Sequence, residues 1–207
     1  MFFSSPLVLV VTTGMFVSAS CALAQISVTE RFAPGQPPVV VTAGRALDTG
    51  YPDDSLARFQ WAIDRGVDAL VVSVQLTGDG HYIVLYDGTL TRTTNVRDVY
   101  PNGAPRRDPG DAVARWHLVA DYTLEEISRL RLIDPQGGDH PVPTLNEALD
   151  LIDEQVLTVL NPQGFKVDSL AEQLKGRDNR HLLVFNEGDL PKLRAFTAAT
   201  GIGAWST

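Results

Sequence analysis

Short apolar runs alternate with stretches of helical periodicity from residue 39 to the end of the chain. The apolar runs predict strands at residues 39–41, 69–76, 156–160, 181–185 and 202–205, and a turn at residues 78–80 leads from the second run into an apolar stretch at residues 82–87. Runs with so few polar side chains are typical of strands that are covered on both faces in a parallel sheet.

Helical patterns fill the intervals between these runs. The first helix is expected to follow Asp54 or Ser55, because either residue is a suitable N-cap and Leu56, Phe59 and Ile63 then recur on one helix face. A strand, a helix and a second strand within so short a stretch form a βα unit.

Two capping boxes mark later helix starts. Glu126 follows Thr123 by three residues, and Glu147 follows Thr144 in the same way, each directly before apolar positions. Further helices are expected near residues 168–174 and 189–199, whereas the Pro-, Gly- and Asp-rich residues 96–118 are expected to be irregular. The alternation of strands and helices predicts an α/β fold with a parallel sheet.

The N-terminal segment reads as a targeting sequence. Residues 1–24 carry no charged side chain and end in the small residues Ala22 and Ala24, which is typical of a secretory signal peptide. A basic n-region is missing, so an uncleaved membrane anchor and a lipoprotein acylated at Cys21, the only cysteine, are the alternatives. The apolar stretch is shorter than the ~20 residues that a span requires. We therefore expect signal cleavage, no stable membrane span afterwards and a secreted or periplasmic protein.

The charge balance restricts the partners. Residues 25–38 are polar and proline-bearing and are expected to form a linker before a single domain at residues 39–207. The chain has 17 Lys and Arg against 25 Asp and Glu, a net charge of −8. Because binding to nucleic-acid phosphates needs clustered basic side chains, we expect no nucleic-acid partner. The oligomeric state does not follow from the sequence.

Four ordered motifs give the chain a family resemblance. They are QLTGDG at residues 75–80, DGTLTRTTN at residues 87–95, DYTL at residues 121–124 and PTL at residues 143–145. Together they resemble the glycerophosphodiester phosphodiesterase family, which has a PLC-like phosphodiesterase barrel. The resemblance implies a TIM-barrel-like (β/α) parallel barrel with its site at the carboxyl ends of the strands, where a divalent cation and two histidines cleave a phosphodiester.

The length of the chain limits how much of such a barrel it can form. A closed barrel of eight βα units typically needs ~250 residues, more than residues 39–207 supply, so we expect an incomplete barrel with about five to six of the eight units. The chain could be a fragment, a truncated gene product or a smaller open sheet. Truncation is favoured because a strand-like segment ends the chain without a helix to cover it.

The residues that the resemblance implies for catalysis are replaced in this sequence. The family's two histidine positions hold Gly44 and Tyr86, and its three metal-carboxylate positions hold Val71, Ser73 and Val159. Valine offers no oxygen, and a serine hydroxyl is a weak substitute for a carboxylate. Shifting the alignment of the second strand by one residue restores no ligand, because residues 69–78 contain no acid. We therefore expect neither a catalytic residue nor a metal ligand at these positions.

A few polar residues remain near the implied site. Arg45 is what is left of the family's His-Arg-Gly motif, and its planar guanidinium is a candidate for phosphate binding. The equally weighted alternative is an ion pair of Arg45 with Asp53 or Asp87. These two acids are the residual polar pocket candidates, although Asp87 is expected to bind Arg92 in an architectural role.

Tyr86 and the histidines are not expected to do chemistry. A phenol with an ordinary pKa near ~10 is a poor base at neutral pH, so Tyr86 is expected to pack in the core or line a pocket. The histidines lie away from the family's catalytic positions, and surface or loop roles are expected for His81, His117, His140 and His181.

Three hypotheses follow for function. The leading one is a glycerophosphodiester phosphodiesterase-family pseudoenzyme without a cofactor, which binds a small phosphodiester or glycerol phosphate or has an interaction role. The runner-up is an active phosphodiesterase with a displaced Ca²⁺ or Mg²⁺ site that includes Asp53 and Asp87. The third is a non-functional fragment.

Overall fold

A computed structural model describes residue 35 and residues 41–43, 49–108, 110–186 and 188–206 of the chain. In chain order, the elements are β1 (Val41–Ala43), α2 (Leu56–Ile63), β2 (Ala69–Leu76), β3 (Tyr82–Val84), α3 (Val96–Val99), η1 (Ala112–Trp116), η2 (Val119–Asp121), α4 (Leu124–Ser128), α5 (Leu145–Ile152), β4 (Leu157–Gln163), α6 (Val167–Leu174), η3 (Asn179–His181), β5 (Leu182–Phe185), α7 (Leu190–Thr200) and β6 (Gly203–Trp205). The prefix η marks a 3₁₀ helix.

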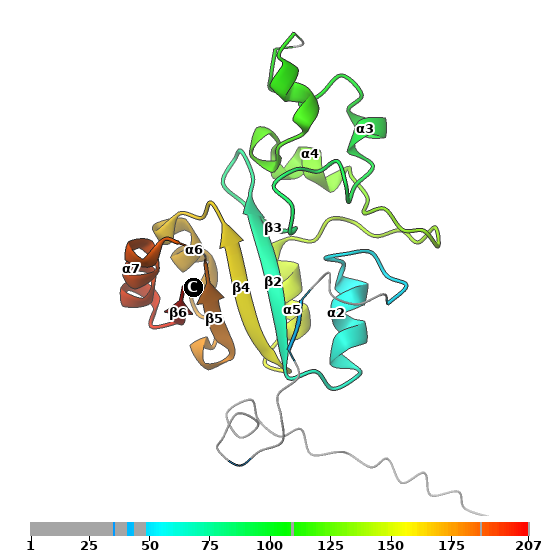
Figure 1. The fold of residues 1–207 in the computed structure, drawn as a ribbon. Coiled ribbons are helices and arrows are strands. Elements are labelled where there is room, and N and C mark those ends of the chain that lie inside the picture. The colour runs from blue at the N-terminus through cyan, green and yellow to red at the C-terminus, as the bar shows by residue number, and fades with distance from the viewer. Residues whose placement is uncertain (1–34, 36–40, 44–48, 109, 187, 207) are drawn as a thin grey trace, which may run out of the picture.

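The strands form one six-stranded sheet in the order β1-β2-β4-β5-β6, with β3 paired to β2 outside this path (Figure 1). All strands on the path are parallel, as the sequence pattern predicts. The strand β3 is antiparallel to β2 because the turn between them is too short for a crossover. Within the described residues β1 and β6 do not pair with each other, so the sheet is open rather than closed into a barrel.

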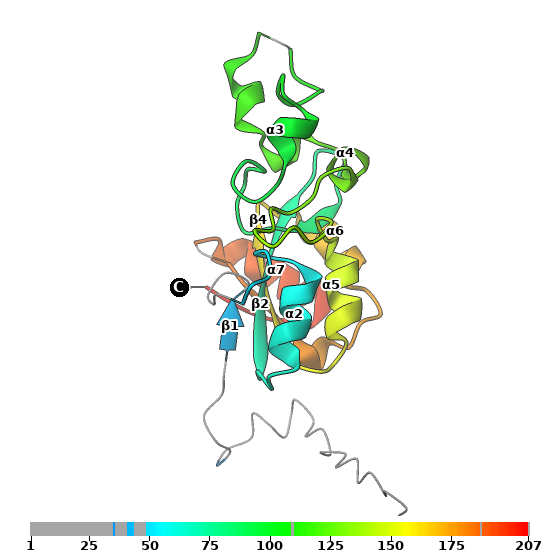
Figure 2. The ribbon, with the colours of Figure 1, turned by 90° about the vertical axis from the view of Figure 1, so that its right-hand side faces the viewer.

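One face of the sheet carries the main core. Alternate residues of β2, namely Leu70, Val72 and Val74, are buried against apolar side chains of α2, α5, α6 and α7. In Figure 2, α2 and α5 lie beside β2 on this face. The intervening residues of β2 point to the opposite face because successive strand side chains alternate. That second face holds the positions at which the resemblance places the metal.

Residues 96–108 and 110–142 form a separate layer beyond the carboxyl end of β2 (Figure 1). They are more regular than expected, because α3 and η1 fall in the stretch predicted to be irregular. The short helices are stabilised by a second core that buries Val96 and Leu130, and η1 begins where Asp111 accepts a hydrogen bond from the Val113 backbone. Packing therefore supplies order that the Pro- and Gly-rich sequence does not indicate.

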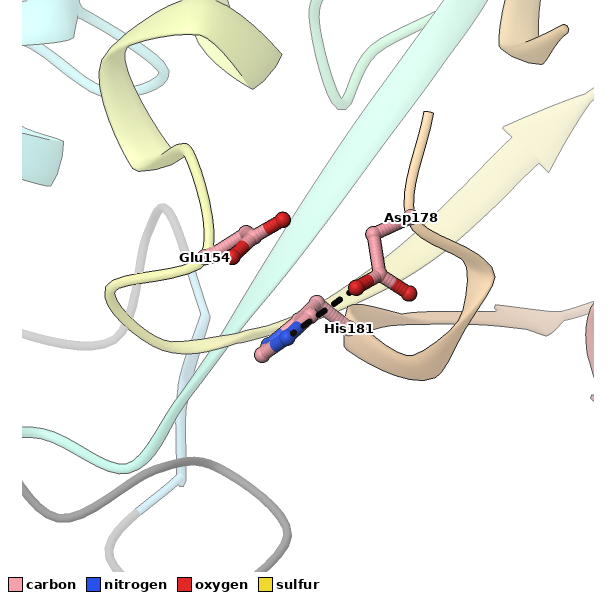
Figure 3. A group of neighbouring side chains, drawn as sticks. All are labelled: Glu154, Asp178 and His181. Atoms are coloured by element: carbon pink, nitrogen blue, oxygen red, sulfur yellow. Dashed lines mark ion pairs between the residues drawn. The ribbon is translucent and has the colours of Figure 1, made fainter. Parts of the chain in front are cut away.

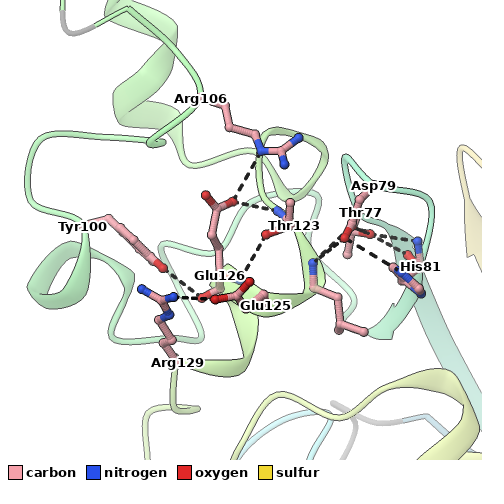
Figure 4. Close-up of polar contacts among 10 residues, drawn as sticks. Thr77, Asp79, His81, Tyr100, Arg106, Thr123, Glu125, Glu126 and Arg129 are labelled. Atoms are coloured by element: carbon pink, nitrogen blue, oxygen red, sulfur yellow. Dashed lines mark hydrogen bonds and ion pairs between the residues drawn. The ribbon is translucent and has the colours of Figure 1, made fainter.

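Side-chain hydrogen bonds attach this layer to the sheet (Figure 4). Thr123 and Glu126 form the predicted capping box at the start of α4, and the one between Thr144 and Glu147 is also present. Asp79, in the turn between β2 and β3, accepts the Leu124 backbone N–H at 3.1 and 3.3 Å. The carboxyl end of β2 is thereby tied to α4.

Several strand limits differ from the predictions. The strand β4 continues past residue 160 to Gln163, because its pairing with β2 extends this far. The Pro162 carbonyl also accepts a hydrogen bond from Asn186 Nδ2 at 2.7 Å. His181 belongs to η3, so β5 begins one residue later than expected. Among the described residues, no helix is both long and apolar enough to cross a membrane.

Candidate functional site

Neighbouring strands bring the implied metal positions side by side. Val71 of β2 is in register with Val159 of β4, and Ser73 is in register with Asn161. The two residues on each strand are two positions apart, and side chains two apart on a strand point to the same face. All four side chains therefore point to one face of the sheet. The geometry that the resemblance requires is therefore present, but it offers two valines, one hydroxyl and one amide.

The surroundings of these positions are apolar. Val159 forms a buried cluster with Ala69 and Leu157, and Val71 and Phe185 pack against that cluster. Ca²⁺ takes about six to eight oxygen ligands, and Mg²⁺ requires a nearly octahedral set of oxygens. The hydrocarbon side chains present here fit neither ion, so no catalytic step can be derived through a metal at these strands.

Tyr86 lies at the surface. Its side chain is 42% exposed, so it does not pack in the core, and the alternative that it lines a pocket stays a prediction. The chain leaves the sheet at the end of β3, two residues before Tyr86. The Tyr86 backbone is nevertheless fixed, because its N–H donates to Asp54 Oδ2 at 2.9 Å and its carbonyl accepts from Gln75 Nε2 at 2.9 Å.

The first histidine position and its neighbouring arginine lie outside the described residues. Gly44 and Arg45 both fall in the stretch 44–48. The phosphate-binding role of Arg45 and its alternative as an ion-pair partner of Asp53 or Asp87 therefore remain predictions.

Two arginines bind the acids of the implied displaced metal site. Arg92 pairs with Asp87 through Nε, and its Nη1 lies 3.0 Å from Asp53 Oδ2. Arg58 Nη1 lies 3.2 Å from Asp53 Oδ1. These four residues are termed the arginine-bridged cluster, and they join the segment before α2 to the loop after β3. A cation bound by Asp53 and Asp87 would have to displace Arg92.

Asp54 is a buried acid that the sequence pattern does not reveal. It is 1% exposed, and burial raises its pKa to about 6, opposed in part by the hydrogen bond from the Tyr86 N–H. Ser55, not Asp54, caps α2, because its Oγ accepts from the Arg58 N–H at 3.2 Å. Asp54 has a φ of 60°, a left-handed conformation in which Asp is one of the commoner residues. An acid beside a helix start is ordinarily exposed, so its burial carries no sequence signal.

The histidines do not gather at this end of the sheet. His117 is 3% exposed and its Nδ1 lies 2.6 Å from Tyr122 Oη, so it is not a surface residue, although it lies in the loop between η1 and η2 as expected. Burial in the second core lowers the pKa of His117. The His81 side chain is 57% exposed and its Nε2 lies 3.9 Å from Asp79 Oδ2. Neither histidine contacts the arginine-bridged cluster.

Curated relatives of this chain are named as phosphodiesterases. A glycerophosphodiester phosphodiesterase of Caldanaerobacter subterraneus subsp. tengcongensis is 32% identical over 120 residues, which is 56% of this chain and 41% of the relative. A Bacillus altitudinis protein of the same name is 29% identical over 124 residues, 58% of this chain and 43% of the relative. The chain thus spans less than half the length of either relative.

Solved structures share the fold. A glycerophosphoryl diester phosphodiesterase from Parabacteroides distasonis superposes with a TM-score of 0.66 at 19% identity, over 87% of this chain and 60% of that one. An Oleispira antarctica phosphodiesterase in complex with the product sn-glycerol-3-phosphate gives a TM-score of 0.60 at 20% identity, over 82% and 64%. These similarities confirm the expected TIM-barrel-like α/β fold, here with an open sheet.

A family model also matches most of the chain. The model described as the glycerophosphoryl diester phosphodiesterase family matches residues 45–193, which include the helices and parallel strands from α2 to β5. The chain belongs to the glycerophosphoryl diester phosphodiesterase family.

Proposed function

We propose that this domain keeps the scaffold of its family but has lost metal-dependent phosphodiester hydrolysis. The observation that carries the proposal is the register of Val71 with Val159, which fills the centre of the implied metal site with hydrocarbon. The arginine-bridged cluster supports the proposal. Asp53 and Asp87, the acids that a displaced metal site would use, already have cationic partners. On this proposal the domain needs no metal cofactor.

The proposed remaining role is to bind a small phosphodiester or a glycerol phosphate, with Arg45 as the phosphate ligand. The product complex of the Oleispira antarctica phosphodiesterase supports this class of ligand. A secreted or periplasmic location is proposed on the strength of the uncharged residues 1–24. A role in binding a protein partner is the alternative if no phosphate ligand binds.

Two observations favour the rival proposal of an active enzyme. The curated relatives are named as phosphodiesterases, and Asp54, with its pKa raised to about 6, lies next to Asp53 in a range suited to proton transfer near neutral pH. For that enzyme to work, a Ca²⁺ or Mg²⁺ ion would have to displace Arg92 from both acids that it contacts.

An assay of hydrolysis separates the two. The purified chain is incubated with a glycerophosphodiester and either Ca²⁺ or Mg²⁺, and released glycerol 3-phosphate is measured against the Caldanaerobacter relative under identical conditions. We expect no release by this chain, because no described residue at the implied metal positions supplies a carboxylate. Metal-dependent release well above the background would contradict the proposal.

If release is seen, the isosteric variants Asp53→Asn and Asp87→Asn identify its origin. Loss of turnover in both variants would establish the displaced metal site. Turnover that survives in both would place the chemistry elsewhere and remove the rival proposal as well.

Thermal unfolding tests the binding role. Glycerol 3-phosphate is expected to raise the unfolding midpoint, since a ligand at about 100 times its Kd adds about 2.7 kcal/mol to the free energy of unfolding. Arg45→Gln is expected to abolish the shift, whereas the exposed Arg115→Gln serves as the matched control and keeps it. No shift would argue against phosphate binding, and the absence of any cooperative transition would favour the non-functional fragment.

A further inference from the structure

Three potential metal ligands meet at the amino end of the sheet, opposite to the end discussed so far. Glu154 lies in the turn between α5 and β4, Asp178 is the N-cap of η3, and His181 is the last residue of η3, directly before β5 (Figure 3). The strands β4 and β5 are parallel neighbours, so the turns that precede them lie at the same edge. Residues from two separate turns are thereby brought together.

The spacing is close to that of a coordination shell. One ligand atom from each of the three side chains lies within 4.8 Å of the others, and His181 Nε2 is 3.7 Å from Asp178 Oδ2. Bonds from zinc to nitrogen and oxygen of about 2.0–2.2 Å place neighbouring ligands of a tetrahedral ion about 3.3–3.5 Å apart. Side-chain movements of about 1 Å would therefore bring the three ligand atoms to the separations of a zinc coordination shell.

The buried setting of His181 and a cavity support a ligand at this place. The His181 side chain is 13% exposed and its Nε2 faces Asp178, whereas Nδ1, which points away from Nε2, is buried and has no hydrogen-bond partner among the described residues. With the ring proton on Nδ1, the lone pair of Nε2 is free to bind an ion. The residues also line a cavity of about 230 Å³, and Glu154 at its rim is exposed, so an ion has access from solvent.

Asp178 already holds a cation that an ion could replace. Arg180 Nε lies 2.9 Å and 3.0 Å from its two carboxylate oxygens, and Arg180 Nη2 also contacts Asp178. The Arg180 side chain is 71% exposed, so it can turn into solvent without leaving a buried charge behind.

We propose that Glu154, Asp178 and His181 bind a divalent ion of the zinc type, which joins the turns before β4 and β5. An imidazole together with carboxylates suits Zn²⁺, whereas Ca²⁺ and Mg²⁺ prefer sets of oxygen ligands alone. Three protein ligands leave a coordination position for water. The site is independent of the proposed function, which concerns the other end of the sheet and does not involve zinc.

Calorimetric titration of the full purified chain with ZnCl₂ tests the site, with MgCl₂ and CaCl₂ titrated in parallel. We expect zinc binding near one ion per chain and a rise in the thermal unfolding midpoint, with neither effect from magnesium or calcium. Glu154→Gln and His181→Gln are each expected to weaken zinc binding by about tenfold or more. Glu172→Gln, an equally conservative change at a 73% exposed acid of α6, is the matched control and is expected to bind as the wild type.

Arg180→Gln gives an independent readout. If Arg180 and the metal compete for Asp178, removing the guanidinium raises zinc affinity, an effect that a purely structural ion pair does not produce. Absence of zinc binding in the wild type, or zinc binding left unchanged by both ligand variants, overturns the proposal. Should His181→Gln fail to fold by circular dichroism, Glu154→Gln decides alone, because this exposed side chain is not needed for packing.

Discussion

The two ends of the parallel sheet hold acidic residues in opposite settings. At the carboxyl end, Asp53 and Asp87 are bridged by Arg92, and the buried Arg58 adds a second bond to Asp53. At the amino end, Glu154 and Asp178 lie beside His181, a group that can act as a metal ligand. The end that the family resemblance marks for a metal is therefore the less suited to one.

The two ends differ in the arginines that pair with the acids rather than in the acids themselves. The Arg58 side chain is 7% exposed, so a cation that displaced it from Asp53 would leave a nearly buried guanidinium without this carboxylate. Arg180 at the amino end is 71% exposed and can be displaced into water at little cost. The comparison teaches that acidic residues mark a metal site only when their existing partners can leave.

The largest expected effect concerns Asp54. Its pKa of about 6 lies above the value of 3.8 for an unperturbed Asp, so the folded state binds the proton more tightly than the unfolded state. Stability is therefore full below about pH 4 and falls as the pH rises through about 6, by about 3 kcal/mol in total. Asp54→Asn removes this loss and is expected to raise the free energy of unfolding at pH 8 by about 2–3 kcal/mol.

Urea unfolding at pH 5 and pH 8 measures the effect. Asn keeps a carbonyl oxygen for the Tyr86 N–H and tolerates the φ of 60°, so the charge is the main change. Asp53→Asn is the matched control, and it is expected to lower stability because it breaks bonds to both arginines. A difference between wild type and Asp54→Asn that is the same at both pH values would show that the charge of Asp54 is not the cause.

Much of the fold could be predicted because its signals are local. Capping boxes at Thr123 and Thr144 and the apolar spacing after Ser55 lie within a few residues of the helices that they specify. The extension of β4 to Gln163 could not be predicted, because it depends on pairing with β2, which lies more than 80 residues earlier in the chain. Boundaries set by distant partners leave no local trace.

The same distinction applies to the sites. The prediction that Val71 and Val159 occupy the family's ligand positions follows from the sequence once the family is recognised, since each lies in an apolar strand. The contact between Asp53 and Arg92 spans 39 residues, and Glu154 meets His181 only because β4 and β5 are neighbours. Such groupings require the strand order, which a single sequence does not specify.

Arg92→Gln removes the arginine that distinguishes the carboxyl end from the amino end, and its expected effect on the free energy of unfolding is smaller than that of Asp54→Asn. Asp53 and Asp87 would lose their shared partner, but the Arg92 side chain is 47% exposed, so we expect a loss of only about 1 kcal/mol in the free energy of unfolding. Because Arg92 lowers the pKa of Asp54, its removal should raise that pKa further and move the loss of stability to higher pH.

Unfolding of this variant at several pH values and salt concentrations gives the test. Arg92→Lys keeps the charge but not the fork of donors, and it should retain the Asp54 titration of the wild type while losing part of the stability. If Arg92→Gln also gained Ca²⁺ binding, the carboxyl end would hold a latent metal site after all, and the two ends would differ less than their contacts indicate.

The smallest expected effect is at the amino end, where Asp153 and Glu154 have φ values of 20° and 58°. A left-handed residue other than glycine costs roughly 1–2 kcal/mol, and the entropy that glycine loses on folding offsets about 0.5–1 of it. Glu154→Gly is therefore expected to raise the free energy of unfolding of the metal-free chain by about 0.5 kcal/mol and at the same time to remove the response to zinc. Urea unfolding with and without ZnCl₂ measures both.

Glu154→Gly is informative because it is expected to raise metal-free stability while it removes the response to zinc. Glu154→Gln keeps the backbone strain and should leave metal-free stability unchanged while it weakens zinc binding, so the two variants separate the backbone from the ligand. A loss of metal-free stability in Glu154→Gly would mean that the carboxylate already stabilises the fold by itself. A gain would mean that the chain keeps an acid where glycine is the more stable residue, which is the expected signature of a side chain retained to bind a ligand.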